Sequence, residues 1–168
     1  MSVVACRVTK EGYEIAADSI TVRGHTQTRG QNTSHSKLFE VNDLVVGAVG
    51  SAEESSLLRL FVLTRKPAAA TEQALLEFLS EFSEWKNKKA NHARIENSYL
   101  IGFEGKVFAV EHWLIEEVLT YEAIGAGMDF ALAALHLGHS AQKSVETAIE
   151  LSIFCESPVV VISKVHAS

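Results

Sequence analysis

The 168-residue sequence is poor in several features that mark specialised classes of protein. It has only two cysteines and two prolines, so neither a disulfide scaffold nor a long disordered linker is expected. It contains no run of about 18 apolar residues, so we expect no membrane-spanning helix. Lys and Arg number 15 against 21 Asp and Glu, giving a net charge of −6. This balance argues against a nucleic-acid-binding protein and against electrostatic docking on anionic membranes.

What the sequence does contain is typical of a globular protein, with 47% hydrophobic and 21% charged residues. One domain covering residues 1–168 is expected from this length. No basic and apolar leader follows Met1, which favours a cytoplasmic protein. Cys6 and Cys155 stand far apart in apolar stretches, so we interpret them as buried free thiols.

Turn residues separate three pairs of short β-rich segments, and each pair is expected to form a β-hairpin. The pairs are residues 3–10 with 13–18, 37–41 with 44–49, and 98–103 with 106–111. A further strand is expected within 114–123 and a buried strand over 159–162. The segment from Arg23 to Ser36 has no aliphatic or aromatic side chain, which predicts a long solvated loop.

Apolar residues that recur at helical spacing predict four helices, and Ser51 and Thr71 are the expected caps of the first two. These cover about 51–65, 71–89, 128–137 and 141–154. Ser51 and Glu54 form a capping box for the first helix, and Lys86 suits the C-terminal end of the second. The order of strands and helices predicts an α+β fold in which two mainly antiparallel sheets are flanked by helix pairs.

Five short elements, in their order and spacing, resemble the proteasome β-subunit family of N-terminal nucleophile hydrolases, and most closely its bacterial HslV-like branch and the related bacterial proteasome homologues. The elements are Ser2, Ala17-Asp18-Ser19, Ser36-Lys37-Leu38, Val46-Gly47-Ala48-Val49-Gly50 and Gly125-Ala126-Gly127. The resemblance spans nearly the whole chain. It implies a four-layer αββα sandwich, which agrees with the element order above, and a chain that assembles into rings around an enclosed chamber.

The resemblance also implies an active site. Ser2 would be the nucleophile after removal of Met1, although the family more often has Thr there. Its own α-amine, with a pKa near 7.7–8.0, would be the base. Lys37 would lie beside this amine, Asp18 would orient Lys37, and the Gly47 N–H would bind the oxyanion.

Further implications concern the surroundings of this site. Val45 and Val49 match positions that line the primary specificity pocket, which would make the pocket apolar and narrow. Ala126 occupies a position where the family commonly has Ser. No organic cofactor is needed, but a structural monovalent cation held by backbone carbonyls near Cys155 and Pro158 is implied.

The function expected from this resemblance is that of a self-compartmentalising peptidase. Its partners would be other copies in a stacked double ring, peptide or unfolded protein substrates, and an AAA+ unfoldase. The expanded segment Arg23–Ser36 would influence access to the chamber. Two alternatives stay open. Retention of Met1, together with Ala126, would favour a catalytically silent ring scaffold or binding chamber, and the same chemistry could serve small amides.

Overall fold

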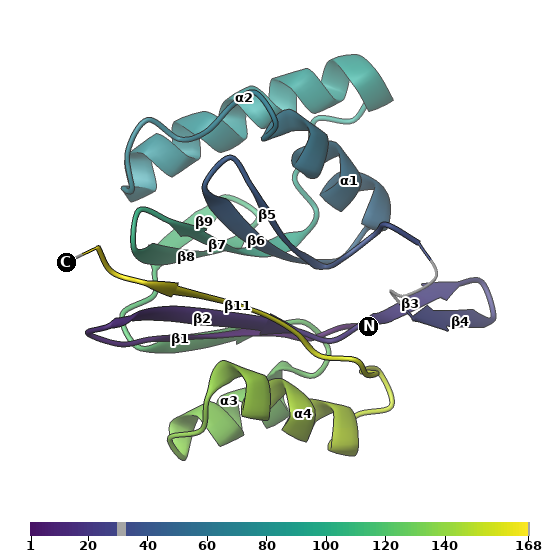
Figure 1. The fold of residues 1–168 in the computed structure, drawn as a ribbon. Helices are drawn as coiled ribbons and strands as arrows, with labels where there is room; N and C mark the ends of the chain where they lie inside the picture. Colours follow the sequence, from purple (N-terminus) through teal and green to yellow (C-terminus); the bar gives the residue numbers. More distant parts are fainter. Residues whose placement is uncertain (30–32, 168) are drawn as a thin grey trace.

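The computed structural model describes residues 1–29 and 33–167. Figure 1 shows four layers, with α1 and α2 over one sheet, α3 and α4 under a second sheet, and the two sheets face to face. The predicted α+β class and αββα order are therefore confirmed.

The first sheet carries both ends of the described chain. Its order is β10-β1-β2-β11, with every neighbouring pair antiparallel. The strands are β1 (Val4–Val8), β2 (Gly12–Ala17), β10 (Tyr121–Ile124) and β11 (Val160–Val165). The predicted first hairpin is thus formed by β1 and β2. The final strand is longer than predicted and is only partly buried, because it lies at the edge of the sheet.

The second sheet contains the other two predicted hairpins. Its order follows the chain, β5-β6-β7-β8-β9. The strands are β5 (Leu38–Val41), β6 (Leu44–Val49), β7 (Ser98–Phe103), β8 (Lys106–Glu111) and β9 (Leu114–Glu117). Asn42 and Asp43 both have positive φ angles, 52° and 65°, as a two-residue type I′ turn requires. The predicted strand at 114–123 is two strands, β9 and β10, which belong to different sheets.

The four predicted helices are present, and the first two begin at the predicted capping residues Ser51 and Thr71. They are α1 (Ala52–Phe61), α2 (Glu72–Ala90), α3 (Met128–His136) and α4 (Ala141–Leu151). The Ser51 and Thr71 hydroxyls accept hydrogen bonds from the third residue beyond them, as N-caps do. The first helix ends at Phe61, earlier than predicted.

The segment Arg23–Ser36 differs most from its prediction. Strand β3 (Ile20–Arg23) pairs antiparallel with β4 (Thr26–Arg29), so much of the expected loop is a β-hairpin. Gly24, with φ of 59°, forms its two-residue turn with His25. Strand β4 has no apolar side chain, and it pairs with β3 through backbone hydrogen bonds. The part of the prediction that falls on residues 30–32 lies outside the described residues.

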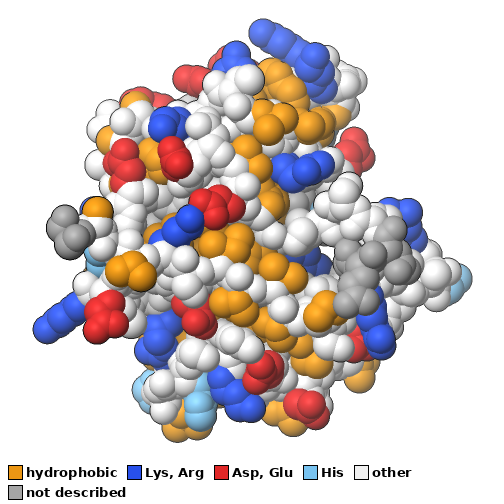
Figure 2. Space-filling view, in the orientation of Figure 1, with side chains coloured by type: hydrophobic (Ala, Val, Ile, Leu, Met, Phe, Trp, Pro, Cys, Tyr) orange, Lys and Arg blue, Asp and Glu red, His pale blue; other side chains and the backbone are white. Residues whose placement is uncertain are grey.

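Apolar side chains fill all three spaces between the four layers. Strand β6 shows how alternation distributes them, because Leu44, Val46 and Ala48 pack toward α1 and α2. Val45 and Val49 belong to the core between the two sheets. Charges of both signs are interspersed on the face in Figure 2. None of the helices in the described ranges has the length and apolarity needed to cross a membrane.

Candidate active site

The residue that sequence analysis places at the nucleophile position is buried at the start of the first sheet. Ser2 is 4% exposed and directly precedes β1. Its carbonyl accepts a hydrogen bond of 3.1 Å from Gly127 N–H. At Gly125, with φ of 99°, an added Cβ would lie 2.4 Å from the Ser2 carbonyl oxygen. The loop before α3 therefore holds Ser2 through close backbone contact that requires glycine.

Asp18 and Lys37 form the ion pair that the resemblance implies. The Lys37 Nζ lies 2.8 Å from Asp18 Oδ1, and both side chains are almost completely buried. Asp18 Oδ1 also accepts from Val3 N–H, and Oδ2 accepts from Ile20 and Glu156 N–H. These four hydrogen bonds fix the carboxylate in one position, and it in turn orients the ammonium group.

Burial also sets the electrostatic character of Lys37. Burial lowers the pKa of Lys37, and the neighbouring Asp18 carboxylate, which acts in the opposite direction, does not fully offset it. A partly desolvated ammonium group held by one carboxylate disfavours a second positive charge beside it. It would therefore lower the proton affinity of an amine placed nearby.

A pocket of about 290 Å³ opens beside these residues. Its wall includes Ser2 and Lys37, and it continues to His35, Ala48, Gly50 and Ser55. Asp18 does not line it but contacts Lys37 from behind. The structure thus brings the predicted nucleophile, lysine and acid together at one cavity, from the chain start, β2 and the segment before β5.

Gly47 is not placed as predicted. It lies inside β6, opposite Leu38 on β5 and Leu100 on β7. Ala48 N–H donates to Lys37 O on the β5 side, so strand alternation turns the Gly47 N–H toward β7. A Cβ at Gly47 would meet Val4 Cγ1 at 2.5 Å. Glycine is needed here for packing between the sheets, and Gly47 does not line the pocket.

Val45 and Val49 are displaced for the same reason. Odd-numbered residues of β6 face the core between the sheets, so neither valine lines the pocket beside Ser2. The pocket wall on β6 is Ala48, followed by Gly50 with φ of 128°. The expected apolar pocket is therefore replaced by one with hydroxyl, amide and imidazole groups.

Sequence analysis missed the residue that holds the Gly50–Ser51 turn. Asn97 Oδ1 accepts from Ser51 N–H at 2.6 Å, and Asn97 Nδ2 donates to Ser51 O at 2.9 Å. An added Cβ at Gly50 would lie 2.4 Å from Asn97 Oδ1. No local sequence signal marks Asn97, because the two partners are 46 positions apart. The side chain fixes the backbone that borders the pocket.

Only half of the predicted capping box exists. Glu54 N–H donates to the Ser51 hydroxyl, but the Glu54 carboxylate points inward. It accepts from Lys86 Nζ at 2.8 Å, from Tyr99 OH at 2.9 Å and from the backbone N–H groups of Glu96 and Asn97. Burial alone would raise the pKa of Glu54, but these hydrogen bonds together lower it. Lys86, expected at a solvated helix end, is 2% exposed.

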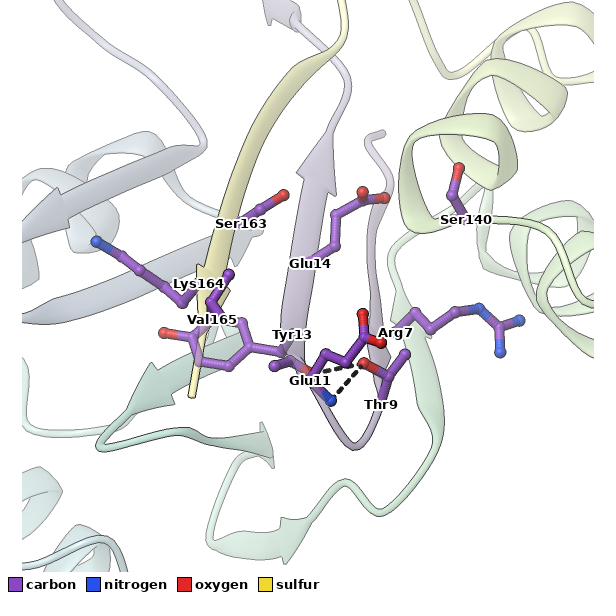
Figure 3. A pocket seen from close by; sticks show the side chains of 10 residues that line it. Arg7, Thr9, Glu11, Tyr13, Glu14, Ser140, Ser163, Lys164 and Val165 are labelled. Carbon is purple, nitrogen blue, oxygen red and sulfur yellow. Dashed lines mark hydrogen bonds between the residues drawn. The ribbon is translucent and has the colours of Figure 1, made fainter. Parts of the chain in front are cut away.

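A second pocket, of about 270 Å³, lies at the β1–β2 turn (Figure 3). Figure 3 shows side chains of β2 and β11, such as Glu14 and Lys164, around it. The Thr9 hydroxyl in this turn is engaged by Glu11 N–H. The turn is the end of β1 opposite to Ser2. This pocket brings no serine or threonine together with a buried base and is not the candidate site.

The structural cation implied near Cys155 and Pro158 stays a prediction. The carbonyls of Glu156 and Pro158 accept from the backbone N–H and hydroxyl of Ser19. These two hydrogen bonds tie the loop after α4 to the end of β2. Cys6 and Cys155 are buried free thiols, as predicted, and burial raises the pKa of Cys6 to about 12. No cluster of three metal-binding side chains occurs within residues 1–29 and 33–167.

Comparison with solved structures places this arrangement among known folds. BPH, the bacterial proteasome homologue of Thiobacillus denitrificans, in complex with epoxomicin superposes with a TM-score of 0.88 at 19% identity, over 99% of this chain and 100% of that one. HslV from Trypanosoma brucei superposes with a TM-score of 0.72 at 18% identity, over 98% of this chain and 99% of that one. Anbu from Yersinia bercovieri superposes with a TM-score of 0.70 at 16% identity, over 97% of this chain and 82% of that one.

The chain has a proteasome-like fold. The predicted resemblance to proteasome-like N-terminal nucleophile hydrolases is confirmed at the level of structure. No protein-family model and no curated protein matches the sequence. Within this proteasome-like fold, Ala126 lies exposed between the two glycines that border Ser2. Its methyl group cannot donate a hydrogen bond, so the loop acts on Ser2 through its backbone.

Proposed function

We propose that this chain is a peptidase that uses Ser2 as an amino-terminal nucleophile once Met1 has been removed. The observation that carries the proposal is that Ser2 and Lys37 line one pocket of a proteasome-like fold, with Asp18 holding Lys37 at 2.8 Å. The complex of Thiobacillus denitrificans BPH with epoxomicin, a peptide epoxyketone, supports a peptide ligand for this class of site.

The first step is attack of the Ser2 hydroxyl on the substrate carbonyl. A hydroxyl is a weak nucleophile at neutral pH and needs a base. While Met1 is attached, the Ser2 nitrogen is an amide and the hydroxyl donates to the Met1 carbonyl. Removal of Met1 creates an α-amine that takes the hydroxyl proton. Lys37, close by and positively charged, keeps this amine unprotonated.

The second requirement is a donor for the negative charge on the carbonyl oxygen. The Gly50 N–H fits this role better than that of Gly47, because Gly50 borders the pocket and Asn97 fixes the adjoining peptide. The amine proton then passes to the leaving nitrogen, which departs as the new amino terminus of the product. Water hydrolyses the ester on Ser2 and restores the hydroxyl. This chemistry needs no organic cofactor.

The proposal is tested by intact-mass measurement of the freshly purified assembled protein, with and without a peptide epoxyketone. Formation of the ring adduct consumes both the hydroxyl and a free α-amine. We expect a mass lacking Met1 and a single adduct for each chain. A chain that lacks Met1 but forms no adduct would contradict the nucleophile assignment.

The two glycines of β6 and the following turn are expected to respond differently to alanine substitution. Gly50→Ala should lower kcat by about 10²–10³, the range for loss of one oxyanion donor, because the new Cβ displaces the turn from Asn97. Gly47→Ala should lower the thermal midpoint through contact with Val4, with kcat per folded molecule retained. Equal losses of kcat per folded molecule would overturn the assignment of Gly50.

The competing candidate is a silent scaffold. Ala126, exposed and without a hydroxyl, is the observation in its favour, since the proteasome family commonly has serine at this point. A chain that retains Met1 in assembled particles and forms no epoxyketone adduct would establish it. Hydrolysis of a small amide with no cleavage of peptides would instead favour the amidase alternative.

Self-association is part of the proposal. Six large apolar side chains are exposed on or beside α3 and α4, and they are Met128, Phe130, Leu137, Leu151, Ile153 and Phe154. Burying such a surface against another copy would remove apolar area from water. The proposed assembly is a stacked double ring in the cytoplasm, supplied with unfolded protein by an AAA+ partner. Light scattering of the purified protein measures its mass.

A further inference from the structure

The pocket beside Ser2 has a wall that is short of negative charge. Within the described residues no Asp or Glu lines it, and its ionisable side chains are Lys37 and His35. Lys37 is committed to Asp18. The His35 imidazole forms no hydrogen bond to any described residue, and only its backbone N–H is engaged, by Thr33. It is therefore free to donate into the pocket.

The pocket wall also carries a hydroxyl that no described residue engages. Ser55, on α1, is 5% exposed and lines the pocket. Its backbone N–H donates to Ser51 O, but its Oγ has no hydrogen-bond partner among the described residues. No buried side-chain polar atom among the described residues lacks a partner, so this Oγ reaches solvent in the pocket and can donate to a ligand there.

Positive charge surrounds this end of the pocket from several elements. Arg59 approaches from α1 and Arg23 from β3, and neither forms an ion pair within the described parts of the chain. Burial of the imidazole, followed by the charges of Lys37, Arg59 and Arg23, lowers the pKa of His35. Asp18 shares a smaller pocket wall with His35, and this carboxylate is paired with Lys37. The same cations would attract a bound anion.

Apolar atoms complete the wall without making it hydrophobic throughout. Ile20 and Val22 on β3 and Ala48 on β6 can contact the methylene groups of a side chain. Val45 and Val49, which would have made an apolar pocket, face the core between the sheets. An aliphatic stem with a polar, anionic end matches this combination.

We propose that this pocket accepts a glutamate or aspartate side chain immediately before the cleaved bond, with His35 as the residue that determines this specificity. The inference rests on the proposed peptidase function and names its substrate class. His35 donates to the carboxylate, and the Ser55 hydroxyl provides a second donor. A bound carboxylate raises the pKa of His35, so acidic substrates gain from protonation of the imidazole as the pH falls.

The test uses four fluorogenic peptides that differ only at the residue before the cleaved bond, which is Glu, Gln, Leu or Lys. The assembled protein lacking Met1 should cleave the Glu peptide with a kcat/KM about tenfold above that for Gln, a difference typical of one charge-assisted hydrogen bond. The ratio of Glu to Gln should increase from pH 8 to pH 6. Preference for Leu or Lys would overturn the proposal.

Variants separate His35 from general effects on folding. His35→Leu should bring the ratio of Glu to Gln close to one while cleavage of the Leu peptide is retained. His25→Leu, at the exposed β3–β4 turn and outside the pocket wall, is the matched control and should leave the ratio unchanged. An unchanged ratio in His35→Leu would contradict the role of His35.

A chemical probe distinguishes failure of this proposal from failure of the peptidase function. Epoxyketones with Glu or Leu at the same position are compared by their labelling rates, measured by intact mass. Faster labelling by the Glu compound supports the pocket proposal. Labelling by the Leu compound alone would overturn the acidic preference and leave the nucleophile in place. Labelling by neither would overturn both proposals.

Discussion

Replacing Ser2 by alanine is expected to abolish peptide hydrolysis and epoxyketone labelling. In a serine protease, loss of the nucleophile lowers kcat on the order of 10⁶, so activity here should fall below detection. Alanine is small enough for removal of Met1 to continue, so the variant keeps the free amine and loses only the hydroxyl. The measurement is hydrolysis of the Leu peptide together with intact mass.

The matched control is Ser144→Ala. Ser144 is also buried, but its hydroxyl donates to O of Ser140, the N-cap residue of α4, away from the pocket. This variant should retain hydrolysis and labelling, although it loses one hydrogen bond. If Ser2→Ala still hydrolysed the peptide at a rate comparable with Ser144→Ala, another residue would be the nucleophile.

The second large effect concerns stability. Lys86→Met should lower the free energy of unfolding by about 3–5 kcal/mol, the typical cost of removing one partner of a buried ion pair. The reason is that Glu54, 5% exposed, would be left as a buried carboxylate with its donor 2.8 Å away removed. Urea unfolding at pH 7 and fixed protein concentration measures this change.

An exposed ion pair provides the control. Lys106 and Glu117 lie 2.9 Å apart but their side chains are 45% and 33% exposed, so Lys106→Met should change the free energy of unfolding by less than about 1 kcal/mol. The double variant Glu54→Gln/Lys86→Met should recover part of the loss. Equal effects of Lys86→Met and Lys106→Met would contradict the importance of burial.

The sign of the pH dependence follows from the lowered pKa of Glu54. A group whose pKa is lower in the folded state adds stability above its unfolded pKa, near 4.3, and this stability disappears as the pH falls through the folded value. The wild-type protein should therefore lose this contribution below about pH 4. In Lys86→Met the pKa of Glu54 rises, so the deficit relative to wild type should shrink at acidic pH.

Local patterns predicted most of the elements correctly because their signals are local. The turn Asn42–Asp43 needs residues that tolerate positive φ, and the caps Ser51 and Thr71 bond to donors three residues away. The β3–β4 hairpin was missed because β4 has no apolar residue and therefore no apolar alternation. Strand pairing through the backbone leaves no such pattern in the sequence.

The candidate site was predicted less completely, because it depends on which way strand residues point. Ser2 and Lys37 do line one pocket, and Asp18 holds Lys37 from outside its wall. The register of β6, however, turns Gly47 and Val45 into the core and leaves Ala48 and Gly50 at the pocket. A shift of one residue in the register of a strand moves all of its side chains to the opposite faces of the sheet.

By itself the sequence determined the α+β class, the Asn42–Asp43 turn and the caps of the first two helices. The resemblance carried by the sequence also predicted that Lys37 lies near Ser2 and that Asp18 pairs with Lys37. Only the tertiary structure decided that Glu54 and Lys86 are a buried pair, and that His35, Ser55 and Asn97 border the pocket. The physical reason is distance along the chain. Asn97 is 46 residues from Ser51, and only the packing of α1 against the second sheet brings them together.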